Sequence, residues 1–127
     1  MTGPDPTEAA ARVVAAYNEK DFARLRQLLS PSIVMSHFNR NYSTNSRDAL
    51  LETMALFAEQ LMTNRQFEPP ERVLRVGDLS IREGYWGGTA TCDIPGFAGA
   101  GEVVRVKLCS LMRFDANGIL LEWTDYG

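Results

Sequence analysis

The chain has 127 residues, of which 45% are hydrophobic and 23% are charged, a composition typical of one globular domain. Its formal net charge of -3 and its scattered basic residues argue against a nucleic-acid-binding surface, which would be basic. No apolar run is long enough to cross a membrane, and residues 1–10 lack the basic and apolar regions of a signal peptide. We therefore expect a cytoplasmic protein without a nucleic-acid or membrane partner.

Two cysteines and one histidine provide few ligands for a metal ion. Cys92 and Cys109 lie on predicted strands without a CxxC pattern, which favours two buried, reduced thiols. A zinc site needs several His or Cys ligands, and His37 is the single histidine of the sequence. The sequence therefore predicts neither a metal site nor a disulfide.

The N-terminal half predicts three helices and one strand. A side chain suited to capping precedes each helix, and apolar residues recur at helical spacing after each cap: Thr7, Asp21 and Ser46. The first helix is expected from Glu8 onwards, and residues 1–6 are expected to form a flexible tail. The strand is predicted over Ile33–Phe38, and the polar residues 39–45 after it predict a loop.

The C-terminal half predicts antiparallel strands. Residues 72–82 and 85–94 have strand character, with a kink or bulge expected at Gly77-Asp78. Several glycines around the start of the second stretch weaken this assignment, because glycine in a strand often marks a bend or a close backbone approach. The glycine-rich residues 95–101 then predict a flexible connection.

The clearest element is the stretch Val103–Tyr126, which predicts two long strands joined at Asn117-Gly118. Asn-Gly between alternating apolar runs is the strongest short-range hairpin signal. One face of these strands is apolar except for Ser110 and Asp125. Because a core does not hold an unpaired ionised carboxylate, we interpret these faces as the wall of a ligand cavity with Asp125 at its working end.

This order of elements resembles the nuclear transport factor 2-like superfamily, which includes ketosteroid isomerase, SnoaL-like polyketide cyclases, scytalone dehydratase and limonene epoxide hydrolase. The last hairpin has a Phe-Asp-x-x-Gly turn and a Trp-x-Asp-Tyr ending, which are common in this group. Three stretches carry the resemblance: residues 11–38, 46–61 and 106–126.

The resemblance implies an α+β fold with a single SnoaL-like α+β barrel domain over residues 7–127. In this fold a cone-shaped, curved antiparallel sheet, of the cystatin-like kind, carries three N-terminal helices on its concave face. The resemblance further implies a deep apolar pocket, no cofactor, and a homodimer packed through the sheets.

The positions that are functional in ketosteroid isomerase are changed in this sequence. His37 matches its catalytic Asp, Val13 its oxyanion Tyr and Ser110 its protonated Asp, so the mechanism of that enzyme is not expected. Asp125 lies where SnoaL-like cyclases place an acid–base Asp. We therefore predict His37 and Asp125 as catalytic residues, because an imidazole with an ordinary pKa near 6.5 suits proton transfer at neutral pH. The competing interpretations are a core histidine that is hydrogen-bonded to backbone and a strand-end Asp that is solvated or paired with an Arg.

The contact between these two groups decides their pKa values. If they touch, Asp125 favours the imidazolium and raises the pKa of His37; if they are apart, burial lowers the pKa of His37 and raises that of Asp125. The predicted ligand-binding residues are aromatic, sulfur-containing or hydroxyl side chains on the same faces: Tyr17, Met35, Trp86, Ser110, Met112 and Trp123.

The favoured function is a cofactor-free isomerase, cyclase or dehydratase that moves a proton on an apolar carbonyl or polyketide-like ligand. A non-catalytic ligand-binding domain of the same fold and a dimerisation module with a filled cone are the alternatives. A limonene epoxide hydrolase-like activity is the weaker enzymatic alternative, since Thr91-Cys92-Asp93 lacks the Arg of the Arg-x-Asp unit in that enzyme.

Overall fold

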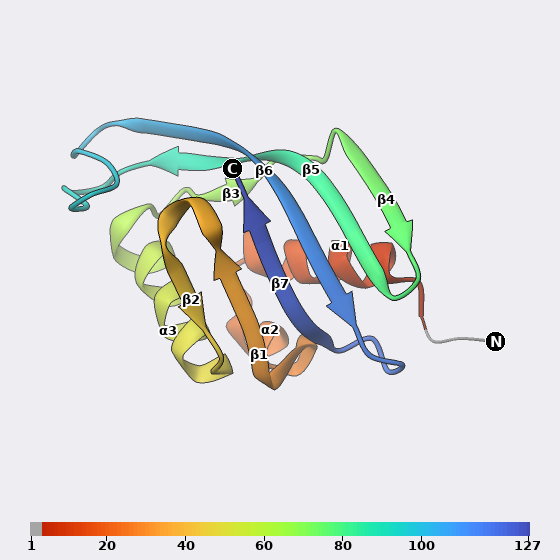
Figure 1. The fold of residues 1–127 in the computed structure, drawn as a ribbon. Helices are drawn as coiled ribbons and strands as arrows, with labels where there is room; N and C mark the ends of the chain where they lie inside the picture. Colours follow the sequence, from red (N-terminus) through yellow and green to blue (C-terminus); the bar gives the residue numbers. More distant parts are fainter. Residues whose placement is uncertain (1–3) are drawn as a thin grey trace.

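The computed structural model describes residues 4–127 as three helices packed on one face of a curved seven-stranded sheet (Figure 1). The predicted α+β fold is therefore confirmed. The helices are α1 (Pro6–Asn18), α2 (Phe22–Leu28) and α3 (Arg47–Leu56), and α3 continues into a π-helical turn over Phe57–Leu61. The strands are β1 (Leu29–His37), β2 (Tyr42–Thr44), β3 (Gln66–Phe67), β4 (Arg72–Val76), β5 (Leu79–Thr89), β6 (Val103–Phe114) and β7 (Leu120–Tyr126).

The strands lie in the order β2-β1-β7-β6-β5-β3, and β4 pairs with β5 outside this path. All neighbours are antiparallel except β1 and β7, which are parallel, so the sheet is mixed rather than purely antiparallel as predicted. This pairing joins strands far apart in the sequence, and no local pattern signals it. It places His37 directly opposite Asp125, while β6 places Ser110 opposite Asp125 on the other side.

Helix α1 begins at Pro6, two residues earlier than predicted from Glu8. Asp5 rather than Thr7 is its cap, because the Oδ1 atom of Asp5 accepts the Thr7 backbone N–H at 2.9 Å. Proline suits the first position of a helix, where its missing N–H removes no hydrogen bond. Of the predicted tail, residues 1–3 lie outside the described residues.

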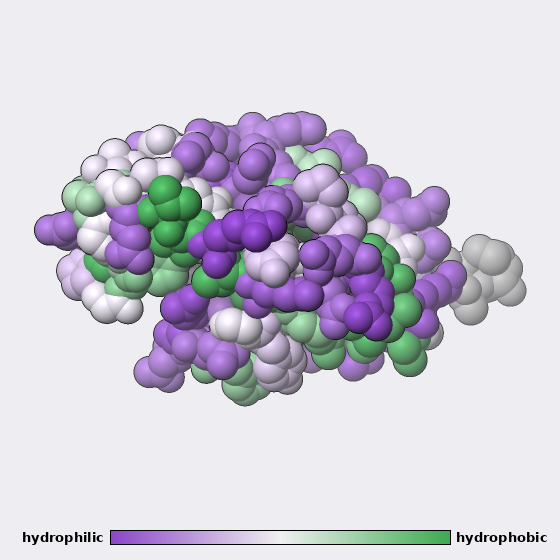
Figure 2. All heavy atoms as spheres, turned by 90° about the horizontal axis from the view of Figure 1, so that it is seen from above, coloured by the Kyte–Doolittle hydropathy of each residue, from purple (hydrophilic) through white to green (hydrophobic). Residues whose placement is uncertain are grey.

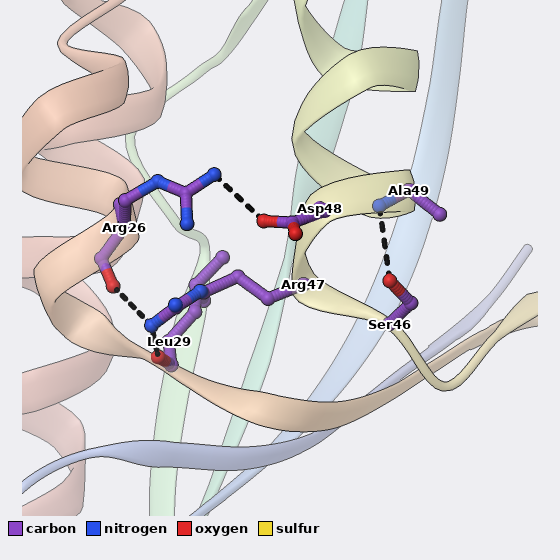
Figure 3. Close-up of polar contacts among 6 residues, drawn as sticks. All are labelled: Arg26, Leu29, Ser46, Arg47, Asp48 and Ala49. Atoms are coloured by element: carbon purple, nitrogen blue, oxygen red, sulfur yellow. Dashed lines mark hydrogen bonds and ion pairs between the residues drawn. The ribbon is translucent and has the colours of Figure 1, made fainter.

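The start of α3 is tied to the end of α2 (Figure 3). Ser46 is the predicted cap, and its Oγ atom accepts the backbone N–H of the residue three positions later at 3.2 Å. The guanidinium of Arg47 donates to the carbonyl oxygens of Arg26 and Leu29 at 3.2 and 3.5 Å. Arg26 also pairs with Asp48 at 2.7 Å, on the exposed surface. These contacts fix α3, which forms one side of the cavity described below.

We expect Ser46→Ala to lower the free energy of unfolding by about 1 kcal/mol, because the first turn of α3 loses its capping oxygen. Urea denaturation measures this change. The matched control is Asp48→Asn, which removes an exposed ion pair and is expected to cost less than about 0.5 kcal/mol. A larger loss in the control than in Ser46→Ala would contradict the role of the cap.

The start of β1 and the presence of β2 differ from the sequence prediction. Strand β1 begins at Leu29 rather than Ile33, because the chain stays extended through Pro31. Leu29 pairs with Leu120 of β7, and after an irregularity in register the pairing resumes at Val34. The predicted loop over 39–45 contains the short strand Tyr42–Thr44, which pairs with the end of β1. This strand lies at the edge of the sheet, and its side chains are partly exposed. Its residues are therefore polar, and the sequence pattern predicts a loop instead of a strand.

Gly77-Asp78 forms the turn of the β4–β5 hairpin and not a kink within one strand. Gly77 has φ +61°, a left-handed conformation that glycine adopts without a steric penalty. Strand β5 continues through the following glycines to Thr89, as an extended strand paired with β6. At Gly87 a Cβ atom would lie 1.9 Å from the carbonyl oxygen of Val104, so the close backbone approach excludes any side chain there.

The core lies between the helices and the concave face of the sheet, and Trp123 is buried at its centre opposite Met35 and Met112. Both cysteines are free, but Cys92 is exposed in the β5–β6 connection and not buried in a strand as predicted. In the part of the chain that the structure describes, no helix is long and apolar enough to span a membrane.

Candidate functional site

A cavity of about 220 Å³ lies between the helices and the concave face of the sheet. This volume is below the roughly 300–1,000 Å³ of pockets for drug-sized ligands, so the cavity suits a ligand smaller than a typical drug molecule. The wall is mainly aromatic and aliphatic and comes from α1, β1, α3, β5, β6 and β7. Among its lining residues, His37, Arg40 and Asp125 are the acidic and basic ones.

Phe97, from the connection between β5 and β6, lies at one side of the cavity. Its ring is 6.1 Å from that of Phe57 and 6.2 Å from that of Trp86, between ring centroids. The guanidinium of Arg40 lies 5.2 Å from the centroid of the Phe97 ring. In Figure 2, apolar surface shows among hydrophilic residues towards the end of the molecule that carries this connection.

Asp125, near the end of β7, is a buried carboxyl group on the cavity wall, 3% exposed. Its Oδ1 atom accepts the indole N–H of Trp123 at 2.9 Å. Burial raises the pKa of Asp125 to about 6, because a carboxylate loses its hydration there, although hydrogen bonds from Ser110 and Trp123 lower the pKa in part. Asp125 is thus a carboxyl group whose proton affinity suits exchange near neutral pH.

His37, at the end of β1, lines the same cavity. No ion pair within 4.0 Å joins His37 and Asp125 in the described chain, although the two residues lie opposite each other on β1 and β7. Burial lowers the pKa of His37, and the nearby charge of Arg40 lowers it further. These directions are those expected for a histidine apart from Asp125. The imidazole is therefore mainly neutral at pH 7, and its buried Nδ1 atom has no hydrogen-bond partner among residues 4–127.

Tyr17, near the end of α1, is one of the residues that line the cavity. The indole N–H of Trp86 donates to that hydroxyl oxygen at 2.9 Å. The Phe67 ring packs against the Tyr17 ring with 5.1 Å between centroids. Burial raises the pKa of Tyr17, so its phenol is neutral near pH 7.

The structure brings together both predicted catalytic residues and four of the six predicted ligand-binding residues. His37 and Asp125 share the cavity with Tyr17, Met35, Trp86 and Trp123. Ser110 and Met112 lie outside its lining. They share a strand face with the lining residues of β6, but this end of the strand is covered by the core, where Met112 is 1% and Ser110 3% exposed.

Several lining residues were not predicted from the sequence. Phe97 lies in a glycine-rich segment that predicted only a connection, although a lone Phe among small residues is a usable signal there. Arg40 lies in a short 3-10 turn within the predicted loop. The lining residues of α3 and the turn after it face both the core and the cavity, which the helical stripe cannot distinguish: Leu50, Thr53, Met54 and Phe57.

Within the described residues, no group of three or more His, Cys, Asp or Glu side chains is placed to hold a metal ion. The chemistry that the lining residues themselves provide is proton transfer and hydrogen bonding in a largely apolar space. Asp125 accepts a proton, the Tyr17 hydroxyl donates or accepts a hydrogen bond, and Nδ1 of neutral His37 donates or accepts one according to its tautomer.

Several solved structures share this fold. A candidate polyketide cyclase from Pseudomonas putida is 18% identical with a TM-score of 0.83, covering 98% of this chain and 92% of that chain. A protein of Catenulispora acidiphila with a ketosteroid isomerase-like fold, solved in complex with trimethylamine, is 19% identical with a TM-score of 0.76, covering 99% of this chain and 87% of the other. At these identities the likeness shows the fold alone.

A third structure, a candidate SnoaL-like polyketide cyclase from Shewanella denitrificans, is 17% identical with a TM-score of 0.77, covering 95% of this chain and 88% of that one. Among curated protein sequences, none matches this chain. The sequence model of the SnoaL-like domain matches residues 10–123, nearly the whole length of the fold described above. On this match the chain belongs to the SnoaL-like family.

Proposed function

We propose that this protein is a cofactor-free enzyme that moves a proton on a small apolar carbonyl compound, with Asp125 as the general base. The observation that carries this proposal is a buried carboxyl group with a pKa of about 6 on the wall of a largely apolar cavity. A base is most effective when its pKa lies near the working pH, because it is then ionised and still binds a proton firmly. Two proteins of the same fold are described as candidate polyketide cyclases, which agrees with the proposed class of substrate.

In the proposed step, Asp125 removes a proton from the carbon next to the carbonyl group. The C–H bond breaks, an O–H bond forms on the carboxyl group, and the electron pair moves to the carbonyl oxygen to give an enolate. Return of the proton to another carbon gives an isomer. Attack of the enolate carbon on a second carbonyl carbon gives a ring, and the second carbonyl oxygen, which receives the electron pair, takes the proton back from Asp125. The apolar wall favours both, because it excludes water that would compete for the base.

His37 has a supporting role in this proposal. Its imidazole is mainly neutral because burial and Arg40 lower its pKa, and its Nδ1 atom is unpaired. A neutral imidazole accepts a hydrogen bond from a substrate hydroxyl group, or takes up a proton after the first step. His37 thus suits a substrate that carries a hydroxyl group near its carbonyl group.

Hydrogen–deuterium exchange of β-tetralone in heavy water, followed by NMR, tests this function. This small bicyclic ketone is apolar and has acidic protons next to its carbonyl group. We expect the protein to accelerate the exchange and Asp125→Asn to lose the acceleration. Binding of β-tetralone without any acceleration would favour the alternative function, a non-catalytic ligand-binding domain.

We further propose a homodimer packed through the outer faces of the two sheets. Val34 on β1 and Tyr126 on β7 are each 44% exposed on the side of the sheet away from the helices, and Phe38 stacks on Tyr126 with 5.0 Å between ring centroids. Such an apolar face gains stability when a second copy covers it. Light scattering is expected to give twice the chain mass of 14.1 kDa.

The dimer prediction has a matched pair of variants. Val34→Glu places a charge on the proposed interface and is expected to give monomers. Leu56→Glu places the same charge on an equally exposed apolar residue of α3, on the other side of the sheet, and is expected to leave the dimer intact. A monomeric wild-type protein at micromolar concentration would refute the dimer.

A further inference from the structure

The hydroxyl group of Tyr17 has a free hydrogen. Because the indole N–H of Trp86 is only a donor, the Tyr17 oxygen must accept in the 2.9 Å bond between them. In the described part of the chain, no hydrogen bond uses the hydrogen of the hydroxyl group. Tyr17 lines the cavity that also contains Asp125, so this hydrogen is available to a ligand.

Arg65 lies over the ring of this tyrosine, and its side chain is buried, since only 1% of the residue is exposed. Its guanidinium carbon is 3.9 Å from the centroid of the Tyr17 ring, and its Nη1 atom donates to the Tyr17 carbonyl oxygen at 2.8 Å. No carboxylate pairs with Arg65 among residues 4–127, and its Nε and Nη2 atoms have no partner. The aromatic ring is therefore the main group that the charge of Arg65 faces.

A cation over a phenol ring withdraws electron density from it and favours negative charge on its oxygen. The charge of Arg65 accordingly opposes the effect of burial on the pKa of Tyr17. A phenol polarised in this way donates a stronger hydrogen bond. It does so in a site from which water is largely excluded, where a fixed donor is most effective.

We propose that Tyr17 is a second catalytic residue, the donor to the carbonyl oxygen of the substrate, and that Arg65 is a positioning residue that holds and polarises it. This inference rests on the proposed function. When Asp125 takes the proton from the neighbouring carbon and the electron pair moves to the carbonyl oxygen, Tyr17 stabilises the oxygen through its hydrogen bond. Tyr17 keeps its own proton throughout, so the step stays balanced.

The infrared carbonyl stretch of bound acetophenone tests this inference without any turnover. The methyl group of the probe is deuterated and the solvent is heavy water, so exchange does not alter the spectrum. In the wild-type protein the stretch is expected at lower frequency than in a hydrocarbon solvent. Tyr17→Phe is expected to return it close to the hydrocarbon value, to weaken acetophenone binding about tenfold, and to slow β-tetralone exchange about 100-fold or more.

The role of Arg65 needs variants that separate charge from shape. Arg65→Lys keeps a cation and is expected to keep most of the frequency shift, whereas Arg65→Met is expected to lose much of it. Arg65→Gln serves as a second neutral variant if Arg65→Met does not fold. A neutral variant of either kind that binds acetophenone with the full shift would overturn the role of Arg65.

The chain has a matched control pair outside the cavity. The Arg105 guanidinium carbon, on β6, lies 3.7 Å from the centroid of the Tyr85 ring, on β5. The two residues are stacked like Arg65 and Tyr17, but neither of them lines the cavity. Tyr85→Phe and Arg105→Met are expected to leave the carbonyl frequency unchanged. An unchanged frequency in Tyr17→Phe would overturn the proposal.

The infrared and exchange measurements separate the two proposals. If Asp125→Asn loses the exchange while the carbonyl frequency is the same in Tyr17→Phe as in the wild type, the inference about Tyr17 fails and the proposed function stands. If the frequency depends on Tyr17 but the protein accelerates no exchange, Tyr17 is a binding residue and the enzymatic function fails. If neither ketone binds up to its solubility limit, both proposals fail.

Discussion

Asp125→Asn is expected to abolish proton exchange and, at the same time, to make the protein more stable at pH 8. An amide cannot take up the proton, and the loss of a positioned general base typically costs about 100- to 10,000-fold in rate. The gain in stability has a separate cause. The wild-type carboxyl group is 3% exposed, and it must be ionised at pH 8 in surroundings that give it little hydration.

The sign of the pH dependence follows from the two states of the protein. The pKa of Asp125 is about 6 in the folded protein, against an ordinary value of 3.8. Below pH 3.8 the group is protonated in both states, so its contribution to stability is fully present there. As the pH rises towards 6, the unfolded chain ionises first and this contribution is lost. The difference in pKa corresponds to about 3 kcal/mol at high pH.

Urea denaturation of both proteins from pH 4 to pH 8 measures this effect. The free energy of unfolding of Asp125→Asn is expected to exceed that of the wild type by about 1–3 kcal/mol at pH 8, with little or no advantage at pH 4. The matched control Asp78→Asn removes a carboxylate on the exposed β4–β5 turn and is expected to exchange β-tetralone at the wild-type rate. An Asn variant less stable than the wild type at pH 8 would mean that the carboxylate is well solvated.

The largest loss of stability is expected for Trp123→Ala, about 3–5 kcal/mol. Trp123 is 1% exposed at the centre of the core, and its indole N–H is bonded to Asp125. The smaller side chain leaves a cavity between Met35 and Met112, the residues opposite it on the neighbouring strands. It also leaves Asp125 without one of its hydrogen bonds.

Trp123→Phe separates these two losses, because it keeps most of the volume and removes only the N–H group. We expect it to be more stable than Trp123→Ala and to have a pKa at Asp125 above the wild-type value of about 6, since the lost hydrogen bond lowers that pKa. Urea denaturation gives the stability, and the pH profile of β-tetralone exchange gives the pKa. An unshifted pH profile in Trp123→Phe would argue against Asp125 as the base.

The features of the fold that were predicted correctly have local causes. The hairpin at Asn117-Gly118 and the caps Asp21 and Ser46 are each determined by a few neighbouring residues. The parallel pairing of β1 with β7 depends on segments at opposite ends of the chain, and so does the position of His37 opposite Asp125. Only the family resemblance gave an indication that these two residues line one site.

The alternation of side chains along a strand predicts which residues of the candidate site share a face. It does not predict which residues on that face line the cavity and which are covered by the core. Alternation correctly placed Leu108 on the concave face of β6, and it placed Met112 there as well. Which of them meets the cavity and which meets the core depends on where the helices cover the strand. Arg65 gave no signal either, because a single Arg after a helix predicts a solvated surface residue.

Strand β7 follows all the other strands of the fold in the sequence, and it lies inside the sheet between β1 and β6. During synthesis on the ribosome, every other strand is therefore made while the place of β7 is still empty. Both neighbours then expose unpaired backbone groups, which favours association with other chains and with chaperones. Pairing over so long a stretch of sequence also closes a large loop, and such folds form slowly. The cavity wall that Trp123 and Asp125 form is thus completed only after β7 has been made.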